Sequence, residues 1–300
     1  MNHLLEHWSP LPSLVIVLAF AGWHEIGLRR LLRRTRRDRV TARRQRSLWF
    51  YGGLTVLFIA VGSPLEHWGY DYFYIHMIQH LLLLFAVPSM VVAGAPWQPL
   101  ILGLPLRVRR RSFPSLLHDA RWRPARSAAR FLASPVPAVA AFNLAMVGWQ
   151  IPGPFELAER DAFVHSWLMN AGMLLVGVLF WRQFIPSPPL RMRLGLAGQA
   201  AALVATNLIM WLLAMSMSLF SHHGWYSVYD HIAGVRMSPF ADQLIGAGIL
   251  WVCGDFWAVP ALIVVVRRLI AREQGQADSA IERMLADSQA ARAGTTSGLT

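Results

Sequence analysis

Long apolar runs alternate with short polar connections along most of the chain. Each run is close to the roughly 20 residues with which an α-helix crosses a hydrocarbon core of about 30 Å. The runs lack the strict alternation of a membrane barrel, and lipid leaves no backbone group unpaired, so they predict helices. We therefore predict an all-α fold, a polytopic membrane helical bundle of seven transmembrane helices at residues 11–28, 48–64, 72–95, 131–150, 163–184, 197–219 and 241–266.

These spans form a single transmembrane domain over residues 1–270. The remaining residues, 271–300, are polar and rich in Ala, Ser and Gly, with no apolar stripe after Ile281. Such a composition cannot bury much apolar surface. We expect a short helix followed by a partly disordered polar tail.

The basic residues predict the orientation of the bundle. All 28 are arginine, and 26 of them lie in alternate connections: residues 29–46, residues 107–130, the connection that holds Arg182, Arg191 and Arg193, and the tail from Arg267. The opposite connections hold only Arg160 and Arg236. Because positively charged loops stay in the cytoplasm, the N-terminus is predicted outside and the C-terminus inside. This asymmetry requires an odd number of spans.

Composition agrees with a membrane protein. The chain is 55% hydrophobic and 15% charged, against about 25% charged residues in soluble domains. The net charge of +12 follows from membrane topology, so we expect lipid as a partner and no nucleic acid. The single cysteine, Cys253, excludes an intrachain disulfide framework and any CxxC motif; we expect it to be a small buried apolar residue.

The histidines carry the main chemical signal, because most are predicted at the outer side. His76 and His80 are four residues apart on the predicted third helix, so both imidazoles share one face and can grip one metal ion. An ionisable group at membrane depth normally faces the bundle interior. The nine outer histidines are His3, His7, His67, His76, His80, His165, His222, His223 and His231; His24 and His118 are inner.

Soft ligands accompany these histidines. His165, Met169 and Met173 recur every four residues on the predicted fifth helix. Imidazole together with thioether suits copper, especially Cu(I), although methionine is also common filler in a protein core. Asp242 opens the seventh helix at the same level, and His222 and His223 are weaker candidates in the preceding loop.

Two acids lie within predicted spans. Glu25 follows His24 near the inner end of the first helix, where it can pair with a nearby arginine. Asp255 lies deep in the seventh helix. A carboxylate inside a membrane is a candidate for function, and the alternative for Asp255 is an ion pair with Arg182 or hydrogen bonds to Trp and His neighbours. The chain has no Gly-rich phosphate loop, GxSxG or HExxH motif, so we expect a binding factor and not an enzyme.

The segment IHMIQHLLLLFAVPSMVVAGAPW at 75–97 resembles the polytopic cytochrome c oxidase assembly factors of the CtaG type, associated with caa3-type oxidases. Two further segments, HSWLMNAGMLLVGVLFW (165–181) and DQLIGAGILWVCGDFW (242–257), resemble the same family in the same order. Many members carry a second histidine on the fifth helix, where this chain has Met169, Gly172 and Met173.

The resemblance implies a multi-pass protein of the bacterial plasma membrane that takes part in respiratory chain biogenesis. It implies a role in maturing a haem–copper oxidase, by supplying or seating copper near His76, His80, His165 and Asp242. The implied partners are an oxidase subunit and an exported copper chaperone.

Two other functions fit parts of the pattern. The first is a haem-binding membrane cytochrome or oxidoreductase, in which His76 and His165 would ligate one haem. The second is a copper or small-solute transporter, which favours midplane sites, broken helices and repeated halves. The chain shows no clear repeat, and Asp255 is the main feature in favour of transport.

Overall fold

The computed structural model describes residues 11–230 and 237–296. Within these ranges the structure is helical and contains no strand, which agrees with the all-α prediction. His3, His7, His231 and Arg236 lie outside the described residues. The helices are α1 (Leu11–Leu32), α2 (Arg37–Gly62), α3 (Pro64–Asp71), α4 (Phe73–Leu81), α5 (Val87–Gly94), α6 (Trp97–Gly103), α7 (Leu106–His118), α8 (Arg123–Leu132), α9 (Pro135–Gly148), α10 (Pro152–Arg160), α11 (Ala171–Trp181), α12 (Leu196–Ser218) and α13 (Pro239–Thr296), with short π- or 3-10 turns at η1 (Leu82–Ala86), η2 (Ala120–Trp122), η3 (Val164–Asn170) and η4 (Ser227–Tyr229).

Most of the predicted spans correspond to one long helix or to consecutive helices. By length and composition, the described residues contain five helices able to cross a membrane, and seven if each of two bent pairs counts as one span. The bent pairs are α2 with α3, at 42°, and Ala120–Leu132 with α9, at 77°. Seven spans is therefore the upper count.

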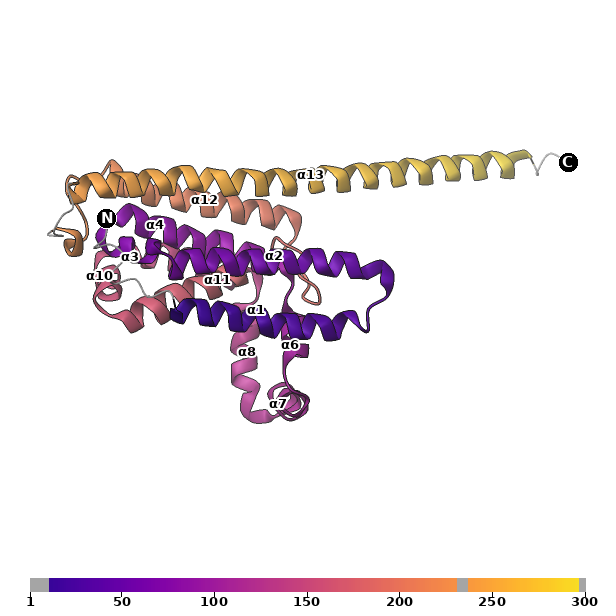
Figure 1. Cartoon of the computed structure of the whole chain (residues 1–300). Helices are drawn as coiled ribbons and strands as arrows, with labels where there is room; N and C mark the ends of the chain where they lie inside the picture. Colours follow the sequence, from indigo (N-terminus) through magenta and orange to yellow (C-terminus); the bar gives the residue numbers. More distant parts are fainter. Residues whose placement is uncertain (1–10, 231–236, 297–300) are drawn as a thin grey trace.

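The fourth predicted span, 131–150, is where the helix bends. Pro135 begins α9, and the preceding residue Ser134 is extended, because a proline disfavours helical backbone in the residue before it. Helix α8 then turns aside with α7, and the two project from the bundle (Figure 1). Phe131 and Leu132, at the end of α8, are exposed, as expected for a helix that projects from the bundle.

The last helix is longer than the predicted seventh span. Helix α13 continues to Thr296, past the end of the other helices (Figure 1), so residues 271–296 are helical, and partial disorder of the tail stays a prediction. The tail contains many Ala, Arg, Glu and Gln residues, which have high intrinsic helix propensity, and no proline after Pro260 interrupts it.

A proline and a glycine bring α11 against α5. Pro88 has no N–H, so it cannot donate to the carbonyl oxygen of Leu84 one turn earlier; the indole Nε1 of Trp181 donates to that oxygen at 3.2 Å instead. Gly177 packs directly on Pro88, where an added Cβ would lie 2.5 Å from its Cγ. This contact fixes α11, and with it the preceding turn η3, beside the third predicted span.

Candidate functional site

The site lies where α4, α10 and η3 meet, within the buried end of the bundle. His76 and His80 are on α4, and His165 is in the π-helical turn η3. All three side chains are buried, at 0%, 3% and 1% exposure respectively. A single π-helical turn within a helix is frequent at functional sites, and here η3 begins one residue before His165.

His76 and His80 interact directly, as their spacing predicted. Their Nε2 atoms are 2.7 Å apart, so one donates a hydrogen bond to the other. The ring of His76 also lies edge-on to the ring of His165, with centroids 5.5 Å apart. The structure therefore brings together the three histidines that the sequence singled out.

Glu159 joins this group, although the sequence analysis overlooked it. Its carboxylate oxygen Oε1 lies 3.2 Å from Nδ1 of His76 and 3.3 Å from Nδ1 of His165. These distances are those of ion pairs, while the angles are not those of hydrogen bonds, and the atoms remain without a hydrogen-bond partner in the described structure. The Glu159 side chain is only 4% exposed, so a buried carboxylate faces two imidazoles.

The sequence did contain a signal for Glu159. Residues 151–162 connect two predicted spans, yet Pro152 lies in the first turn of a helix, a favoured place for proline, and Glu156 and Arg160 have i, i+4 spacing. On α10 the residues Phe155, Ala158 and Glu159 share one buried face. That face could have been found from the helical period alone.

A second contact holds α10 in place. The Glu156 carboxylate accepts hydrogen bonds from the N–H and the hydroxyl of Ser227, at 2.8 and 2.7 Å. These hydrogen bonds, with Arg160 nearby, hold the pKa of the Glu156 carboxyl below its ordinary value. The contact ties α10 to the loop after α12 and so positions Glu159.

Hydrogen bonds set the tautomers of His80 and His76. The Tyr226 hydroxyl donates to the backbone oxygen of Gln150 at 2.8 Å and lies 3.2 Å from its Oε1, which leaves the Gln150 amide Nε2 facing Nδ1 of His80 at 3.2 Å. An amide nitrogen donates, so His80 Nδ1 accepts and a neutral His80 carries its proton on Nε2. That proton is donated to Nε2 of His76, whose own proton is then on Nδ1, facing Glu159.

The remaining nitrogen of the group is free of protein partners. Nε2 of His165 is buried and has no hydrogen-bond partner in the described structure. If its Nδ1 carries the proton toward Glu159, Nε2 presents a lone pair. A carboxylate behind Nδ1 of a histidine is the common arrangement around metal-binding imidazoles, because it orients the ring and raises its basicity.

The other predicted ligands lie outside this group. Asp242 is buried and caps α4: its two carboxylate oxygens accept the backbone N–H groups of Phe73 and Tyr74 at 2.8 and 2.9 Å. Met169 and Met173 are fully buried in the hydrophobic core. His222 and His223 are exposed in the loop after α12.

The acids of the spans have ordinary partners, and the cysteine forms no disulfide. Glu25 pairs with Arg29, as expected, and accepts a hydrogen bond from Tyr51. Asp255 accepts a hydrogen bond from Asn207 at 3.1 Å, a partner that the sequence analysis did not name. Cys253 is half-buried and free.

No group of three or more His, Cys, Asp or Glu side chains in the described ranges is already arranged to hold a metal ion. Two imidazole nitrogens on one tetrahedral ion, each about 2.0 Å from it, would lie about 3.3 Å apart. The 2.7 Å separation of the two Nε2 atoms is therefore that of a hydrogen bond and is shorter than the separation of two ligands on one ion.

Comparison with known proteins places the chain among oxidase assembly factors. The sequence model of the family described as "Cytochrome c oxidase caa3 assembly factor" matches residues 25–272. Two relatives, "Uncharacterized protein Mb0105" of Mycobacterium bovis and "Uncharacterized protein MT0111" of Mycobacterium tuberculosis, are each 25% identical over 239 residues, which cover 77% of this chain and 36% of the relative. The chain thus spans about a third of the length of these relatives. No solved structure matches it.

Proposed function

Because the chain belongs to the cytochrome c oxidase caa3 assembly factor family, we propose that it binds copper through His76, His80 and His165 and helps to deliver it to, or seat it in, a haem–copper oxidase. The observation that carries this proposal is the position of Glu159 behind the Nδ1 atoms of both His76 and His165. It leaves their Nε2 atoms as the ligand positions.

Copper is the cargo that suits this set best. Imidazole nitrogens bind copper well, soft thioether ligands select Cu(I), and the hard cations prefer oxygen ligands. Met169 and Met173, further along the same helical segment, remain predicted thioether ligands. Copper binding would replace the hydrogen bond between His76 and His80, so the His80 proton would move from Nε2 to Nδ1 and the Gln150 amide would turn its oxygen toward Nδ1 to accept it.

The haem alternative fits this geometry less well. Two axial histidines lie on opposite faces of a haem, yet the Nδ1 atoms of His76 and His165 face the same oxygen of Glu159. Phe155 packs on His76 with ring centroids 4.9 Å apart. A macrocycle between the two imidazoles would have to displace both Glu159 and Phe155.

The proposal includes a location and an orientation. The protein is a multi-pass protein of the bacterial plasma membrane, with its N-terminus outside and its arginine-rich end in the cytoplasm. The histidine group is then near the outer face, where an exported copper chaperone can donate its ion. The activity is binding and transfer without chemical turnover.

Metal analysis of purified protein tests copper binding. Wild-type protein loaded with Cu(I) under reducing conditions is expected to retain stoichiometric copper, and His76→Ala/His80→Ala is expected to lose it. The matched control is His24→Ala, a histidine that is equally buried and hydrogen-bonded to Tyr51, but lies on α1. Equal copper in wild type and the double variant would refute the site.

Oxidase maturation is tested separately. The copper content and activity of the caa3-type oxidase are measured in cells that carry His76→Ala/His80→Ala or His24→Ala. Both are expected to fall in the first strain alone. Normal copper content and activity of the oxidase in the His76→Ala/His80→Ala strain, with the variant present at the wild-type level, would refute the link between copper binding and oxidase assembly.

A further inference from the structure

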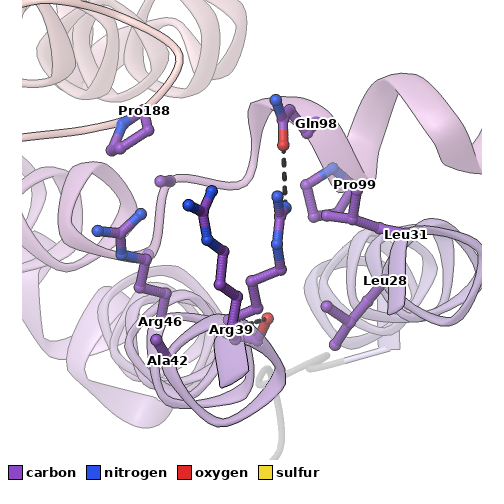
Figure 2. A pocket seen from close by; sticks show the side chains of 12 residues that line it. Leu28, Leu31, Arg39, Ala42, Arg46, Gln98, Pro99 and Pro188 are labelled. Atoms are coloured by element: carbon purple, nitrogen blue, oxygen red, sulfur yellow. Dashed lines mark hydrogen bonds between the residues drawn. The ribbon is translucent and has the colours of Figure 1, made fainter. Parts of the chain in front are cut away.

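A pocket lined by arginines (Figure 2) lies near the connection between α1 and α2, at the other end of the bundle from α4 and α10, which carry His76, His80 and Glu159 (Figure 1). Its volume is about 350 Å³, and it opens between α1, α2 and the link from α5 to α6. Three of its lining residues, Arg39, Arg43 and Arg46, are basic, and none is acidic. We refer to it as the arginine pocket.

The pocket is built by helical spacing. Arg39, Arg43 and Arg46 are at positions i, i+4 and i+7 of α2, which places them on one face. Figure 2 shows the side chains of Arg39 and Arg46 rising from α2 toward the wall that carries Gln98 and Pro188. An Nη1 atom of Arg43 donates to Oε1 of Gln98 at 3.0 Å, so one guanidinium is already held in place.

The opposite wall comes from the GAPW segment, residues 94–97, which is not part of the proposed copper site. Ala95 has a left-handed backbone, with φ of 47°, and reverses the chain between α5 and α6. Gly94 packs on the backbone of Phe50, where an added Cβ would lie 2.8 Å from its nitrogen. The indole of Trp97 donates to Ser187 at 2.7 Å and so holds the turn that contributes Pro188.

The positive charge in the pocket is only partly neutralised by the protein. Arg39 forms a long, exposed ion pair with its neighbour Asp38 at 4.0 Å, whereas neither Arg43 nor Arg46 makes an ion pair in the described part of the chain. Like charges this close repel one another, which favours binding of an anion among them. Gln98 supplies a polar contact, and Leu28, Leu31 and Pro99 supply an apolar wall.

This combination fits a phosphate ester with an apolar part. A guanidinium group forms bidentate hydrogen bonds to phosphate oxygens. Arg46 is two residues before the predicted second span, which starts at 48, so the pocket is at the level of lipid headgroups. The sequence predicts this end to be cytoplasmic, where anionic lipids attract basic segments.

We propose that the arginine pocket binds the phosphate of an anionic phospholipid headgroup, with Arg43 and Arg46 as the main contacts. This inference is independent of copper binding. The same phosphate chemistry could come from a soluble phosphate ester, and the experiment separates the two sources.

The test compares two charge-matched double variants. Arg43→Gln/Arg46→Gln removes two arginines from the pocket, whereas Arg37→Gln/Arg44→Gln removes two from the same helix that do not line it. Delipidated protein in a neutral detergent is titrated with phosphatidylglycerol or phosphatidylcholine, and bound lipid is measured by native mass spectrometry. Phosphatidylglycerol is expected to bind wild type more tightly than phosphatidylcholine.

The pocket variant is expected to lose phosphatidylglycerol affinity by roughly tenfold or more, the effect of one or two charge-assisted hydrogen bonds, with less than about threefold loss in the control. Equal losses in both variants would assign binding to diffuse charge and overturn the proposal, as would no loss in either.

Arg43→Lys/Arg46→Lys is the second variant, used if the glutamine variant does not fold. An intermediate affinity is expected for it, because lysine keeps the charge without the planar fork. Displacement of the lipid by glycerol phosphate at similar affinity would overturn the lipid assignment.

Discussion

Oε1 of Glu159 lies 3.2 Å from Nδ1 of His76, although the two residues belong to different helices, α10 and α4. The same oxygen faces His165. This one carboxylate thereby contacts the imidazoles of both His76 and His165, and His76 contacts His80. The three histidines form one group as a result. The proposed copper binding is therefore expected to depend on that carboxylate.

Glu159→Gln is expected to weaken Cu(I) binding by about 10- to 100-fold, the usual cost of losing a carboxylate behind a metal-bound histidine. The measurement is competition with a Cu(I) chelator of known affinity. Glu156→Gln is the matched control, because Glu156 is on the same helix but contacts Ser227. Equal Cu(I) affinity in both variants would show that Glu159 does not support the copper site.

Asp242→Asn is expected to lower stability and leave Cu(I) affinity at the wild-type value. An asparagine side chain has one acceptor oxygen, so one of the buried N–H groups of Phe73 and Tyr74 loses its partner, at a cost of about 1–3 kcal/mol. Unfolding in mixed micelles and chelator competition measure the two effects. A loss of copper comparable to that of His76→Ala would instead identify Asp242 as a ligand.

Gln150→Leu is expected to change the tautomer of His80. In the wild type, Nδ1 of His80 accepts from Gln150, so nitrogen NMR of labelled histidine should show the proton on Nε2. The variant removes this donor, and the Nδ1-protonated form should gain population. Tyr226→Phe, which removes the hydroxyl donor to Gln150 but keeps the ring, should give a smaller change. A His80 spectrum that is the same in wild type and Gln150→Leu would contradict the assigned hydrogen-bond chain.

Gly27→Ala is expected to destabilise the contact between α1 and α6. An added Cβ would overlap the carbonyl oxygen of Pro99, which is backbone and cannot easily move. The expected loss in the free energy of unfolding is about 2 kcal/mol or more. Gly22→Ala on the same helix meets no atom within 4 Å, and should change stability by less than about 1 kcal/mol. Equal stability of the two variants would contradict the packing described for α6.

The accuracy of the sequence-based predictions depended on the range of the interaction involved. The spacing of His76 and His80 was sufficient to predict their contact, because residues four positions apart on a helix lie on the same face. Most of the apolar runs were likewise recovered as helices. The bend between α8 and α9 was missed, since apolarity alone does not reveal the break at Pro135. Glu159 was missed because residues between predicted spans were assigned to a loop.

The sequence by itself determined that this is a helical protein with apolar segments long enough to span a membrane, and that two of its histidines form a pair on one helix. Those properties follow from the hydrophobic effect and helical period, which act over neighbouring residues. Only the tertiary structure decided that His165 and Glu159 join that pair, that Asp242 caps α4, and that the GAPW segment closes a pocket over Arg43 and Arg46. These contacts join residues far apart in the chain, and their geometry depends on how whole helices pack.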